Sequence, residues 1–96
     1  MCRDPVFGRP VVMPLRSVRK VAADHPDIAH LAPAAVLSAV AAADHACAAP
    51  GWPSRHVYFR RGVGPSQWIC VVVEYDDERR GTVVTAFARR RLPGWA

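Results

Sequence analysis

The sequence predicts an α+β domain in which two N-terminal helices pack on a three- to four-stranded antiparallel sheet. Its C-terminal half holds three runs rich in β-branched and aromatic residues, at positions 56–60, 68–73 and 82–87. Its N-terminal half shows helical spacing of apolar residues and many alanines. Ninety-six residues suffice for one modest core, so residues 1–96 are expected to form a single domain.

The N-terminal segment is predicted to be a loose arm. Residues 1–10 contain two prolines, a glycine and two arginines. Residues 11–13 could add a short edge strand, which Pro14 would stop because proline lacks the backbone N–H that a sheet ladder uses.

The first helix is expected to begin at Leu15. Leu15, Val18, Ala22 and His25 follow one another at spacings of three, four and three, so they share one face. Pro26 ends this helix because the residue before a proline avoids the α conformation. His25 is therefore placed at the helix C-terminus, on the face toward the sheet.

The second helix is expected over residues 34–45. Pro33 suits its first turn, and valine, leucine and alanine give it an apolar stripe for close packing on a sheet. The Pro- and Gly-rich segment 48–53 then breaks the chain.

The predicted strands differ in how polar and apolar residues are distributed over their two faces. In the first strand, one side carries His56, Tyr58 and Arg60, which we expect to form a working surface. Val57 and Phe59 point to the other side and are expected to face the core. The run at 68–73 is apolar on both faces, which predicts a central strand.

Positive charge is concentrated in the predicted sheet. Residues 1–54 carry five basic and four acidic groups, for a net charge of +1, whereas residues 55–96 carry eight and four, for +4. An electropositive sheet is what a phosphate-binding surface requires, although small domains also carry such charge for solubility alone.

The cysteines and histidines favour a reduced, metal-free protein. Three cysteines cannot all pair, and none has the spacing of a zinc site. The four histidines do not form a helical two-His motif, so neither a metal nor another cofactor is expected. No segment approaches ~20 apolar residues, which together with the thiols predicts a cytoplasmic protein without a membrane contact.

A set of cationic and hydrogen-bonding residues is expected near the sheet: His25, His56, Tyr58, Arg60, Arg61 and Thr85. Metal-independent RNA cleavage needs a base for the 2′-OH proton, cations on the phosphate and an acid for the leaving oxygen. Histidine and arginine can fill these roles. The same residues could instead be structural, with the arginines solvating a strand end and His25 closing a helix.

The segment HVYFRRGVGPSQWICVVVEY…GTVVTAFARRRLPGW resembles the Barnase–EndoU–colicin–RelE-like (BECR) nuclease superfamily, notably its small phage- and toxin-associated members. The shared pattern also includes the Asp24-His25-Pro26 helix end and extends over roughly residues 11–95. The chain departs from it at Cys70, where such sequences often carry a basic residue. The resemblance implies a toxin-like, metal-independent endoribonuclease.

Carried over by position, the resemblance implies roles for individual residues. His25 is the candidate acid/base, Arg60 and Arg61 are the phosphate cations, Thr85 is a supporting donor, and Tyr58 stacks on a base or acts as an acid. His56 and the run Arg89, Arg90 and Arg91 are expected to add RNA contacts. The expected partners are RNA and an acidic antitoxin or immunity protein, and an unpaired edge strand could support a homodimer.

Two alternatives stay open at the level of sequence. The first is a non-catalytic RNA-binding module, whose affinity would fall with salt without any cleavage. The second is a protein-binding module that uses Trp52, Trp68 and Trp95 as anchors.

Overall fold

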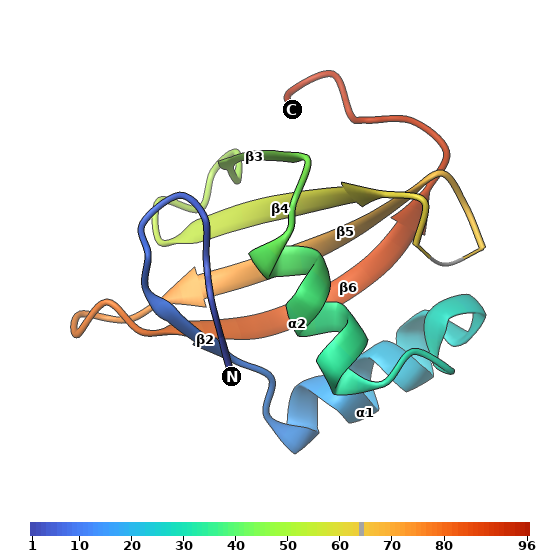
Figure 1. Cartoon of the computed structure of the whole chain (residues 1–96), viewed down its shortest axis with the longest axis horizontal. Helices are drawn as coiled ribbons and strands as arrows, with labels where there is room; N and C mark the ends of the chain where they lie inside the picture. The colour runs from blue at the N-terminus through green and yellow to red at the C-terminus, as the bar shows by residue number, and fades with distance from the viewer. Residues whose placement is uncertain (64) are drawn as a thin grey trace.

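The computed structural model describes residues 1–63 and 65–96 and is dominated by one curled sheet (Figure 1). In these residues six strands follow the order β1-β2-β6-β5-β4-β3. The elements are β1 Cys2–Arg3, β2 Pro10–Val12, α1 Leu15–Asp24, a 3-10 turn Pro26–Ile28, α2 Pro33–Ala41, β3 His45–Ala48, β4 Arg55–Arg61, β5 Trp68–Tyr75 and β6 Gly81–Arg89.

The predicted fold class, two helices on a three- to four-stranded antiparallel sheet, is wrong. The sheet has six strands within the described residues and is mixed, because β2 pairs in parallel with β6 while the other pairs are antiparallel. It curls into a half-barrel, and only α1 and α2 are α-helices there (Figure 1). Strands of two to four residues, such as β1 and β3, are too short to show an alternating pattern.

The second helix ends earlier than the sequence predicts. The helix stops at Ala41 rather than at His45, although its alanines favour helix. The backbone N–H of Asp44 donates to the Phe59 carbonyl at 2.8 Å, and β3 then runs antiparallel to β4. Pairing with the sheet therefore overrides the local helix propensity, as tertiary contacts often do.

Several predicted elements are confirmed. Strands β4, β5 and β6 are consecutive and antiparallel, and β5 pairs on both sides. Helix α1 begins at Leu15 and its last N–H bond comes from His25 to the Val21 carbonyl, immediately before Pro26.

The N-terminal residues are fixed to the sheet rather than forming the expected loose arm. The side chain of Asp4 is 2% exposed. Its carboxylate accepts hydrogen bonds from the backbone N–H groups of Val6, Phe7 and Arg9. Because a buried carboxylate must be hydrogen-bonded, this turn holds β1 against β2.

The sheet has two unlike faces. We call the face under α1 and α2 the helix face; its main buried side chains are Tyr58, Ile69, Val71, Val73 and Val83. We call the opposite face the tail face, because Leu92 and Ala96 of the C-terminal segment pack there on a smaller buried cluster of Val57, Phe59 and Cys70.

The predicted orientation of β4 is therefore wrong. Tyr58, which was expected on a working surface, is fully buried under the helices. Val57 and Phe59, which were expected to face the main core, lie on the tail face. Alternation fixed which residues share a face, but a strand that is buried on both sides gives no sign of which face the helices cover.

Candidate nucleic-acid interface

A row of cationic and aromatic side chains crosses the tail face at one end of the sheet. Arg61 of β4 lies opposite Trp68 of β5, which in turn lies opposite Arg89 of β6. The Arg61 guanidinium carbon is 5.9 Å from the centre of the Trp68 ring. Arg61 and Arg89 are both exposed and make no ion pair within the described residues, so two guanidinium groups are free to contact a ligand on either side of one indole.

A recess of about 300 Å³, here the Trp recess, opens further along the same face. Its floor is formed by Val57, Val72 and Phe87, and its walls include Trp52, Trp95 and Arg55. Trp52 and Trp95 are 54% and 44% exposed, unusual fractions for so large an apolar side chain. The Arg55 guanidinium lies 4.0 Å from the centre of the Trp52 ring.

His25 stands at the margin of this face. It closes α1, and its ring centre is 5.8 Å from that of Phe87, which forms part of the floor of the Trp recess. Its side chain is half-buried. The sequence prediction that His25 lies at the helix end and faces the sheet is therefore confirmed.

Thr85 lies on the same face, opposite Val72 in the ladder. Its hydroxyl oxygen is buried and has no hydrogen-bond partner among the described residues. Burying a hydroxyl without a hydrogen-bond partner costs free energy, so the hydroxyl of Thr85 does not stabilise the fold.

Three of the predicted site residues lie elsewhere. The Tyr58 hydroxyl is 2.6 Å from that of Tyr75, and burial raises the pKa of Tyr58 well above its usual value. Arg60 turns to the helix face and donates to the Ser38 carbonyl of α2 at 3.4 Å. His56 packs against Phe7, with ring centres 5.0 Å apart, and burial lowers its pKa.

The remaining predicted site residues, Arg90 and Arg91, follow β6, and Cys70, where the chain departs from the family pattern, lies beneath the C-terminal segment. Arg90 lines a small hollow with Pro65 and Ser66, and Arg91 is exposed. Cys70 is fully buried, and burial raises the pKa of its thiol to about 11, although the Arg89 charge opposes this shift. Cys70 is therefore an inert core thiol at neutral pH.

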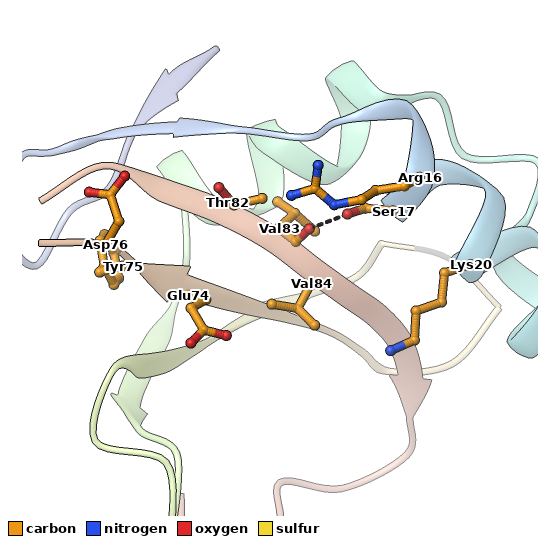
Figure 2. A pocket seen from close by; sticks show the side chains of 9 residues that line it. All are labelled: Arg16, Ser17, Lys20, Glu74, Tyr75, Asp76, Thr82, Val83 and Val84. Carbon is orange, nitrogen blue, oxygen red and sulfur yellow. Dashed lines mark hydrogen bonds between the residues drawn. The ribbon is translucent and has the colours of Figure 1, made fainter. Parts of the chain in front are cut away.

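A second recess, here the α1 recess, lies where α1 packs along β6 (Figure 2). It measures about 560 Å³. Arg16 and Lys20 of α1 project toward it from one side, while Glu74 and Asp76 stand on the other (Figure 2). The Ser17 hydroxyl at its base donates to the Val83 carbonyl at 2.5 Å, which fixes α1 to β6.

Sequence reasoning missed most of these recess residues. Trp52 and Trp95 were weighed only as protein anchors, and Arg55 was not singled out. Arg16 and Lys20 are four residues apart, a spacing that places both on one helix face, and this signal was available in the sequence.

Among residues 1–63 and 65–96, no group of three or more His, Cys, Asp or Glu side chains is placed to hold a metal ion. Within the same residues, neither helix has the length and apolar character needed to cross a membrane.

Comparisons with family models, curated proteins and solved structures found no match for this chain. The resemblance to the BECR nucleases therefore rests on the residues themselves.

Proposed function

We propose that this protein binds single-stranded RNA on the tail face and cleaves it without a metal ion, with His25 as the general base. One observation carries the proposal. His25, Arg61, Thr85 and Arg89 come from the end of α1, from β4 and from β6, yet they all lie on or beside one face that also exposes two tryptophans.

The binding surface has the two components that single-stranded nucleic acids use. Indole rings such as Trp52 and Trp95 can stack on bases, and each stacked base is typically worth about 1–3 kcal/mol. Arg61 and Arg89 can contact phosphates, where the guanidinium fork makes paired hydrogen bonds. Single strands expose their bases, whereas the bases of a duplex stay stacked.

The proposed reaction is an internal transesterification. Neutral His25 removes the proton of a ribose 2′-OH, and the resulting oxygen attacks the neighbouring phosphorus. The bond from phosphorus to the 5′ oxygen breaks, which leaves a 2′,3′-cyclic phosphate and a 5′-hydroxyl that takes its proton from water. Arg61 and Arg89 stabilise the charge that develops on the phosphate oxygens.

A non-catalytic RNA-binding module is the second candidate. Leu92, Trp95 and Ala96 pack over Phe59 and Cys70 at the centre of the tail face, which favours a surface that binds RNA around its rim. Cys70 also stands where a basic residue is expected for the family.

The proposal implies a cytoplasmic setting, where RNA is available, and an acidic protein that could block the tail face. Dimerisation through an unpaired edge of β3 stays a prediction.

The experiment that tests the proposal compares wild-type protein with His25→Gln on an end-labelled single-stranded RNA in EDTA. We expect wild-type cleavage that leaves cyclic phosphate ends, and a loss of about 100-fold or more in His25→Gln. A 2′-deoxy strand of the same sequence is the control and should bind without being cut. Binding of the RNA without cleavage would support the second candidate, and no binding to either strand would contradict both.

A further inference from the structure

We infer that the α1 recess is a phosphate-binding subsite of the same RNA path, so that one strand crosses both the α1 recess and the Trp recess. This inference rests on the proposed RNA binding. It adds that the bound RNA runs from the Trp recess toward the α1 recess. It also assigns a role to Arg16 and Lys20, which the proposed cleavage chemistry does not use.

The charges of the α1 recess favour an anion. Arg16 and Lys20 make no ion pair within the described residues, and their side chains point into the recess from one turn of α1 (Figure 2). The carboxylates on the other side are already engaged. Glu74 binds Arg55 at 2.8 Å, and Asp76 binds Arg80 at 3.4 Å. Arg80 also binds Glu78 at 2.9 Å, so the four cationic groups in and around the recess outnumber the three carboxylates by one.

One ion pair connects the linings of the two recesses and forms a partition between them. Arg55 lines the Trp recess and Glu74 lines the α1 recess, and these two side chains are the partners of the 2.8 Å contact. The Ser54 hydroxyl adds a 2.9 Å hydrogen bond to Glu74, so this partition is held from two sides. A ligand that fills both recesses has to pass this partition.

The chemistry of the two recesses is complementary in the way that a nucleotide chain is. The Trp recess is lined by apolar and aromatic side chains, which suit a base. The α1 recess offers a guanidinium and an ammonium group, which suit a phosphodiester. An oligonucleotide alternates these two groups along one strand, whereas an apolar peptide or a lone phosphate satisfies only one recess.

The test measures binding of a non-cleavable 2′-deoxy octamer to the full chain by fluorescence anisotropy between 50 and 200 mM salt, roughly the range over which phosphate contacts are resolved. The double variant Arg16→Gln/Lys20→Gln is expected to bind about tenfold more weakly at the lowest salt. Its slope of log K against log salt should be smaller by about 0.7 for each lost phosphate contact.

Arg19→Gln is the matched control, since Arg19 lies on the same helix, is exposed and does not line the α1 recess. If Arg19→Gln loses as much octamer affinity for its one charge as the double variant loses for each of its two, the inference is overturned. The effect would then come from the net charge of the protein and not from the α1 recess. The inference would also be overturned if Trp52→Ala weakens octamer binding but Arg16→Gln/Lys20→Gln does not. That result would leave the proposed function intact. Absence of octamer binding by the wild-type protein would instead contradict the proposed function. Competition by inorganic phosphate as strong as that by the octamer would reduce the α1 recess to an anion site and overturn the shared path.

Discussion

The two faces of the sheet are built from the same strands but differ in composition and exposure. The helix face buries a continuous core around Ile69, Val71 and Val73, and the hydroxyl of the buried Tyr58 is hydrogen-bonded to that of the partly buried Tyr75. The tail face buries only a small cluster and keeps arginines and half-exposed tryptophans around it. Strand alternation thus places most of the core on one face and leaves exposed cationic and aromatic side chains on the other.

Strand β4 shows this division within two pairs of neighbours. Tyr58 is buried under the helices while Phe59 faces the tail, and Arg60 contacts α2 while Arg61 approaches Trp68. Substitutions on opposite faces should therefore separate folding from RNA binding, and the following predictions test that separation.

The largest expected effect is on folding and comes from the helix face. Ile69→Ala removes a fully buried side chain from the centre of the main core and should lower the free energy of unfolding by about 2–5 kcal/mol. Urea unfolding followed by circular dichroism measures this loss. RNA cleavage per folded molecule should stay unchanged, and a variant of wild-type stability would show that the helix face does not dominate folding.

A smaller effect on folding is expected from Asp4. Burial alone would raise the pKa of Asp4, but hydrogen bonds from Phe7, Tyr75, Arg9 and Val6 more than offset it, and the pKa is lowered. Asp4→Asn should cost about 1–3 kcal/mol at pH 7, because an amide cannot replace every carboxylate acceptor.

The pH dependence of this effect follows from the lowered pKa. The contribution of Asp4 is fully present above its ordinary pKa of 3.8 and is lost as the pH falls through the lower value of the folded state. Urea titrations at pH 7 and at lower pH should therefore show the gap between wild type and Asp4→Asn closing in acid. A gap of constant size would contradict the assigned role of the carboxylate.

On the tail face the expected effect is on binding. Trp52→Ala should lower the free energy of unfolding by about 1 kcal/mol or less, because the residue is 54% exposed and the contact it loses is that with the Arg55 guanidinium. It should weaken binding of single-stranded RNA by about 1–3 kcal/mol if a base stacks on the ring. Leu15→Ala removes a comparably exposed apolar side chain from α1 and is the control that should bind normally. Equal losses in the two variants would remove the argument for stacking.

The smallest effect on RNA binding or cleavage is expected at Thr85. Thr85→Val removes a buried hydroxyl that has no partner within the described residues, so stability should stay level or rise by up to about 1 kcal/mol. Because the hydroxyl is buried, a donor role toward RNA requires the side chains that cover it to move aside, and such a role predicts that cleavage falls by about tenfold in a single-turnover assay. Full cleavage activity in a variant of unchanged stability would show that the Thr85 hydroxyl has no part in cleavage.

The sequence predicted the parts of this fold that have long, regular patterns. The runs that became β4, β5 and β6 are seven to nine residues long, and Pro26 marked the end of α1. The two-residue strand β1 and the alanine-rich start of β3 had no such signal, because their pairing is decided by distant strands.

The candidate site was predictable in its residue types but only partly in its geometry. His25, Arg61, Thr85 and Arg89 lie on or beside the tail face, but Tyr58, chosen from the same alternating run as its neighbours, belongs to the core. The choice of face depends on where α1, α2 and the C-terminal segment pack, and those contacts are long-range.

The most direct test of the central claim compares Arg61→Gln with Arg60→Gln in the EDTA cleavage assay. The two residues are adjacent in β4, and the substitutions remove the same charge from opposite faces of the sheet. We predict that Arg61→Gln lowers cleavage by about 10- to 100-fold while Arg60→Gln stays within about twofold of wild type. A loss confined to Arg60→Gln, or equal losses in both, would contradict the assignment of RNA to the tail face.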